Sequence, residues 1–83
     1  MNVSEADDLV AELQKAKVDE FIVHTCSLLG SLAYGKLQAG ELDQAKLAID
    51  ALRALVPLVP EGQRGDIQQV VSNLQLAYAD AAG

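Results

Sequence analysis

Residues 21–37 form an apolar stretch that is hydrophobic or small around almost the whole circumference of a helix. A helix of this kind is normally central and covered by other helices. The chain has 83 residues, and a chain of that length buries only somewhat more than about 60% of its unfolded surface. The chain is therefore too short to wrap this stretch, and we expect a second chain to help cover it.

On a helical wheel the stretch divides into three stripes. The polar stripe contains His24, Ser27, Ser31, Tyr34 and Gln38. The small-residue stripe contains Val23, Cys26, Gly30, Ala33 and Leu37. The remaining surface carries Phe21, Ile22, Thr25, Leu28, Leu29 and Leu32. We expect the large residues to pack within the chain's own hairpin and the small stripe to meet a second helix at close range. Whether that helix belongs to a second copy of this chain or to another protein stays open.

The cysteine and histidine content limits how so small a fold can be stabilised. A single cysteine excludes an internal disulfide, and one cysteine with one histidine cannot form a structural zinc site. Small folds without these devices usually oligomerise. We therefore expect a homodimer, with no cofactor and no metal, in a reducing cytoplasmic setting.

The charge pattern excludes several classes of partner. The net charge is −6, and residues 1–20 hold six acidic residues against two lysines. Nucleic acids and anionic membranes are bound through clustered positive charge, which this chain lacks. Residues 21–37 are also too short and too polar to span a bilayer, which needs about 20 mainly apolar residues. We expect a soluble protein that binds neither nucleic acid nor membrane.

Helix-ending residues divide the chain into elements of a single all-α domain covering residues 1–83. Residues 4–38 form one long helix, or two with a bend near residues 15–17, and residues 1–16 either fray or form a separate helical segment. Ala39 and Gly40 close this segment, so an antiparallel hairpin with the helix at 41–56 is expected. Pro57 ends that helix. Beyond the linker at 57–65, a third helix starts at Pro60 or after Gly65.

The second and third helices carry familiar patterns. LDQAKLAIDALRAL at 42–55 followed by VVSNLQLAYADA at 70–81 resembles the bacterial domain-of-unknown-function family 1844. The positions that carry the resemblance are Leu42, Ala45, Ile49, Asp50, Leu52, Leu55, Leu74 and Tyr78. The resemblance covers roughly residues 18–81 and implies a small all-helical bacterial protein without catalytic residues. A single tetratricopeptide-like unit is a weaker likeness, because repeat proteins need several units and no second one follows.

Candidate chemistry is confined to one face of the first apolar helix. His24, Ser27 and Ser31 share that face, which raises the idea of a nucleophile and its base. No orienting third group or oxyanion loop accompanies them, so an exposed polar stripe is the better interpretation. Cys26 has no neighbouring positive charge to activate it and is expected as a small buried residue. We therefore expect no catalytic, cofactor-binding or metal-binding residue and no enzyme.

The leading hypothesis is a non-enzymatic structural or protein-interaction module that self-associates. The alternative is an adaptor whose hydrophobic groove accepts an amphipathic helix of a partner protein. A small enzyme or ligand carrier using the His24 stripe is the third hypothesis. The predicted helix–helix interface consists of Phe21, Ile22, Cys26, Leu29, Gly30, Ala33, Leu37 and Leu76.

Overall fold

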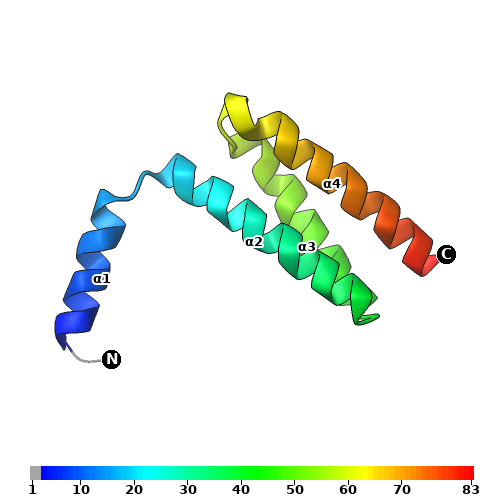
Figure 1. The fold of residues 1–83 in the computed structure, drawn as a ribbon, viewed down its shortest axis with the longest axis horizontal. Coiled ribbons are helices and arrows are strands. Elements are labelled where there is room, and N and C mark those ends of the chain that lie inside the picture. The colour runs from blue at the N-terminus through cyan, green and yellow to red at the C-terminus, as the bar shows by residue number, and fades with distance from the viewer. Residues whose placement is uncertain (1–2) are drawn as a thin grey trace.

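The computed structural model describes residues 3–83, which form four α-helices and one 3-10 turn with no strand among them. The helices are α1 (Val3–Lys15), α2 (Val18–Gln38), α3 (Leu42–Leu55) and α4 (Glu61–Ala82), and the turn η1 (Val56–Leu58) follows α3 (Figure 1). The expected all-α class is confirmed. Of the two alternatives for the N-terminal region, the structure has two separate helices, divided at Ala16 and Lys17.

A tight turn joins α2 and α3 into an antiparallel hairpin. Gly40 has a φ of 76°, a left-handed conformation that glycine adopts without steric cost. The backbone N–H of Glu41 donates to the carbonyl of Lys36 at 2.9 Å, and that of Gly40 donates to Leu37 at 3.1 Å. These two bonds form the Schellman arrangement that ends many helices. A 3.0 Å ion pair between Lys36 and Glu41 spans the same turn.

The connection from α3 to α4 is ordered by proline chemistry and by one arginine. Pro57 lies in η1, where α3 has already ended. The Arg64 guanidinium donates two hydrogen bonds to the carbonyl of Val59, at 2.9 and 3.2 Å, and so ties α4 back to the connection. Helix α4 begins at Glu61 with Pro60 as its N-cap, which is the earlier of the two expected starts.

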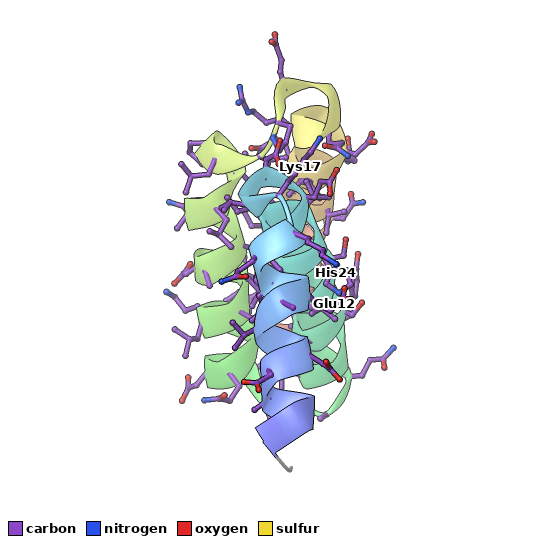
Figure 2. The ribbon with its side chains drawn as sticks, turned by 90° about the vertical axis from the view of Figure 1, so that its left-hand side faces the viewer. Glu12, Lys17 and His24 are labelled. Atoms are coloured by element: carbon purple, nitrogen blue, oxygen red, sulfur yellow. The ribbon has the colours of Figure 1, made fainter. Side chains whose placement is uncertain are left out.

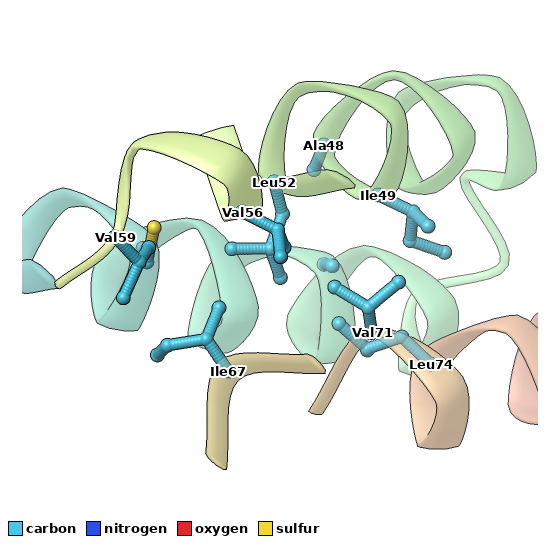
Figure 3. Close-up of a cluster of buried hydrophobic side chains, with 10 residues drawn as sticks. Ala48, Ile49, Leu52, Val56, Val59, Ile67, Val71 and Leu74 are labelled. Carbon is cyan, nitrogen blue, oxygen red and sulfur yellow. The ribbon is translucent and has the colours of Figure 1, made fainter. Parts of the chain in front are cut away.

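The core lies between α2, α3 and α4, which all pack on one another (Figure 3). Leu52 and Leu74 are its largest fully buried side chains, and no polar or charged residue is buried with them. The core cluster consists of Cys26, Ala33, Ala48, Ile49, Leu52, Val56, Val59, Ile67, Val71 and Leu74. The cluster contains no aromatic side chain and consists of Ala, Val, Ile and Leu with one Cys, so the stability of the body rests on close packing of the helices.

The small-residue stripe of α2 faces the inside of this body. Cys26, Gly30 and Ala33 are buried, and a Cβ built on Gly30 would lie 3.3 Å from Cγ1 of Val70 in α4. The helix that packs closely on this stripe is therefore α4 of the same chain. The sequence pattern had instead suggested a helix from a second copy of the chain or from another protein. A large side chain at Gly30 would push α4 away from α2. The side of α2 that carries large side chains could therefore not pack against α4 at this distance.

The large side chains of α2 were expected to pack inside the hairpin. This is correct only for those that border the core. Ile22 and Leu29 are partly buried against the core, but Phe21, Leu28 and Leu32 are each more than half exposed. These three side chains project from the side of α2 that its own chain leaves uncovered.

Helix α1 stands apart from the three-helix body (Figure 1). The radius of gyration is 15.5 Å, compared with about 12 Å for a compact chain of this length. The side chains of Leu9, Val10 and Leu13 are between 50% and 54% exposed. Within the described residues, no other helix covers the apolar edge of α1.

Two neighbouring leucines of α4 give a direct test of the core. Leu74→Ala should lower the free energy of unfolding by about 2–5 kcal/mol, because Leu74 is fully buried and its loss leaves a cavity. Leu76→Ala on the same helix should change it by less than about 0.5 kcal/mol, because that side chain is 68% exposed. Urea titrations followed by circular dichroism measure both, and equal effects would contradict the placement of α4.

The close contact of α2 with α4 is tested at Gly30. Gly30→Leu should lower the free energy of unfolding by about 1–3 kcal/mol, because the added side chain collides with Val70. Gly35 is the matched control, since a Cβ there would meet nothing within 4 Å. Gly35→Leu should raise the free energy of unfolding by about 0.5–1 kcal/mol through helix propensity alone. A Gly30→Leu chain as stable as the wild type would show that α4 does not pack here.

Candidate protein-interaction surface

The exposed side of the α2–α3 hairpin carries two rows of mainly apolar side chains, one on each helix. We call this surface the outer face; it consists of Phe21, Thr25, Leu28 and Leu32 of α2, Leu47, Ala51 and Ala54 of α3, and Leu58 of η1. Its five large side chains are between 52% and 63% exposed. Spacings of three and four residues place each row on one side of its helix.

Both rows point away from α4. Helix α4 packs on the flank of the hairpin that carries Gly30 of α2, and its Tyr78 lies beside Ile49 of α3. At about 100° per residue, Leu28 and Leu47 lie far round their helices from those contacts. The hairpin therefore has one side closed by α4 and one side open to solvent, and the open side is apolar.

A hollow at the elbow between α1 and α2 extends the outer face. Its volume is about 180 Å³, and it is lined by Leu13, Ala16, Lys17, Val18 and Phe21. Leu13 comes from α1 and Phe21 from α2, so the apolar edge of the first helix adjoins the outer face at this point. The hollow is a junction between two apolar surfaces that neither helix covers.

The polar stripe of α2 lies on another side and is exposed along its length, and Figure 2 shows His24 directed outward. The Thr25 hydroxyl donates to the carbonyl of Phe21 at 2.9 Å, and the Ser27 hydroxyl donates to that of Val23 at 3.3 Å. Both hydroxyls thus bond back to their own helix. Among residues 3–83, no hydrogen bond joins His24 to Ser27, and Asp50 pairs with Lys46 at 2.9 Å.

Cys26 lies beneath a shallow hollow of about 280 Å³ between α2 and α4, whose rim includes Ser27, Ser31 and Tyr34. Burial raises the pKa of the Cys26 thiol above its ordinary value of 9.0, because the thiolate loses hydration there. A raised pKa disfavours the nucleophilic thiolate at neutral pH. The described part of the chain holds no group of three His, Cys, Asp or Glu side chains placed to bind a metal ion.

The eight residues predicted for a helix–helix interface fall into three groups. Cys26, Gly30 and Ala33 are buried inside the body, and Ile22, Leu29 and Leu37 are partly buried at its edge. Only Phe21 and Leu76 present large exposed apolar side chains, and Leu76 lies on α4, away from the outer face.

Of the large side chains on the outer face, only Phe21 belongs to the predicted interface. Leu28 and Leu32 were expected inside the hairpin, and Leu47 and Leu58 were not predicted at all. Leu47 lies off the apolar stripe of α3, and Leu58 follows Pro57, so neither belongs to a periodic core pattern. An apolar residue outside the stripe of an otherwise amphipathic helix is the signal that could have found Leu47.

Comparisons of the chain with models of protein families, with curated proteins and with solved structures give no match. The resemblance to family 1844 stays a prediction. Among residues 3–83, none of the helices has a stretch long and apolar enough to cross a bilayer.

The burial of Cys26 predicts a pH dependence of stability. The folded state holds the thiol proton to higher pH than the unfolded state does, so this group destabilises the fold only at alkaline pH. Its contribution should be absent below about pH 8 and grow as the pH rises above the ordinary value of 9.0. Urea unfolding of the wild type and of Cys26→Ala at a series of pH values measures it. The difference between the two chains should change above that pH, and a constant difference would contradict a buried thiol.

Proposed function

We propose that this protein is a non-enzymatic interaction module that self-associates into a symmetric homodimer through its outer face. The observation that carries the proposal is the set of five large apolar side chains, each more than half exposed, on the open side of the hairpin. Monomeric proteins rarely expose contiguous apolar patches larger than a few hundred Å², and such patches usually mark interaction sites.

The small size of the body supports the same proposal. A body of three helices with a core cluster of only ten buried residues is marginal on its own, and its single cysteine rules out an internal disulfide. Covering the outer face would add apolar burial that the chain cannot supply from α2, α3 and α4. A symmetric dimer is the commonest arrangement that covers the same patch on both copies.

The energy available from the outer face bears on how the copies meet. Completing the burial of one half-exposed leucine gains about 1 kcal/mol, or on the order of 10 kcal/mol for both outer faces. Association costs about 4–15 kcal/mol in lost freedom of motion. The outer face alone therefore supports an association of modest strength, and further apolar surface would strengthen it.

A lone cysteine buried as a free thiol fits a reducing compartment, and we propose the cytoplasm on that ground. The net charge of −6 and the absence of a basic cluster support a protein partner rather than nucleic acid or an anionic membrane.

Charges placed on the outer face test the proposal. Leu28→Asp combined with Leu47→Asp should weaken dimerisation at least about tenfold, because the carboxylates would be buried without partners at the interface. Leu76→Asp is the matched control, since Leu76 is equally exposed but lies on α4, and it should leave the dimer unchanged. Sedimentation equilibrium over a concentration series measures the association, and circular dichroism checks that each variant stays helical.

A wild-type chain that remains monomeric at the highest concentration would contradict self-association. If that monomer also bound an apolar dye, and the two aspartates abolished the binding, the outer face would be open to a helix of another protein. That result would favour the adaptor over the homodimer.

A further inference from the structure

Helix α1 is an amphipathic helix without a partner surface. Ala6, Leu9, Val10 and Leu13 share one side of it, and the last three are at least half exposed. An isolated helix of 13 residues is marginal in water, since most helices in proteins are stabilised by packing of an apolar side. A stable α1 therefore requires an apolar surface that its own body, in the observed arrangement, does not provide.

The outer face matches α1 in length and in register. Thirteen helical residues span about 20 Å, and the outer-face row of α2 from Phe21 to Leu32 spans about 17 Å. Consider α1 laid antiparallel along α2, with its C-terminal end beside the first turn of α2. Leu13 would then lie level with Phe21, and Ala6 level with Leu28. Leu13 and Phe21 already line one hollow at that end.

The connection between α1 and α2 favours binding of α1 to the outer face of a second copy rather than to that of its own chain. Only Ala16 and Lys17 separate the helices, and Lys17 is extended, with φ −84° and ψ 133°. In Figure 1, α1 leaves the elbow at an angle to α2 and does not lie along it, so the two helices meet only at the elbow. Short connections that cannot reverse easily are those that promote exchange of a segment between identical chains.

We infer that α1 of each copy lies along the outer face of the other, so that the dimer forms by mutual exchange of N-terminal arms. This inference rests on the proposed self-association and names the contact that makes it. Each arm adds the apolar surface of Leu9, Val10 and Leu13 to the interface. This is the further apolar surface that would strengthen an association through the outer face alone. The contact is the same on both copies, as two-fold symmetry requires.

Cysteine cross-linking distinguishes exchange from closure within one chain. In a Cys26→Ala background, Leu9→Cys and Thr25→Cys are placed on separate chains, mixed, and treated with a short bismaleimide. Arm exchange predicts a covalent dimer on a denaturing gel. The same two cysteines on one chain should also give mainly dimer. A predominantly intrachain product would show that α1 folds back on its own α2 and would overturn the inference.

The matched control replaces Thr25→Cys by Leu76→Cys, which is exposed on α4 and should not cross-link to Leu9→Cys. Sedimentation of the same samples separates the two proposals. A dimer without arm cross-links would overturn arm exchange and leave self-association standing, whereas a monomer would overturn both.

Lengthening the elbow gives an independent readout. Three glycines inserted between Ala16 and Lys17 let α1 turn back onto its own outer face, where its effective concentration is high. The dimer should then dissociate at least about tenfold more readily. The same three glycines appended after Gly83 should have no effect. An insertion that leaves dimerisation unchanged would show that α1 is not the covering element.

Discussion

The close approach of α2 to α4 at Gly30 is the contact on which the rest of this structure depends. A Cβ at this position would lie only 3.3 Å from Cγ1 of Val70 in α4, so the two helices pack closely here and a large side chain would have to displace Val70. Cys26 and Ala33 continue the same narrow strip on α2. Because α2 has one such strip, the approach of α4 determines which side of α2 becomes the interior.

That choice leaves the large residues of α2 outside. Two helices, α3 and α4, cannot surround α2, so a helix that is apolar almost all round keeps one side in water. Here the exposed side contains Phe21, Leu28 and Leu32, and Leu47 of α3 extends it. The apolar edge of α1 is a second unsatisfied surface in the same chain. Both surfaces are left in water by the packing of the described helices.

The helix ends were predictable because they depend on neighbouring residues. Gly40 takes the left-handed conformation that closes a helix, and Pro57 prevents α3 from continuing, and both act locally. The candidate interface was less predictable, since three of its eight residues, Cys26, Gly30 and Ala33, are in the core. Periodicity shows that a side of a helix is apolar but not which apolar side its own chain will cover.

The sequence by itself determined an all-helical chain, the turn at Gly40, the end of α3 before Pro57 and a surplus of apolar surface around residues 21–37. Those properties follow from local conformational preferences and from composition. Only the tertiary structure decided that α4 covers the small stripe, that the large stripe forms the outer face, and that α1 stands away from the body. These depend on contacts between residues far apart in the chain, such as Gly30 and Val70, where the fit of side chains selects one packing among several that the same pattern allows.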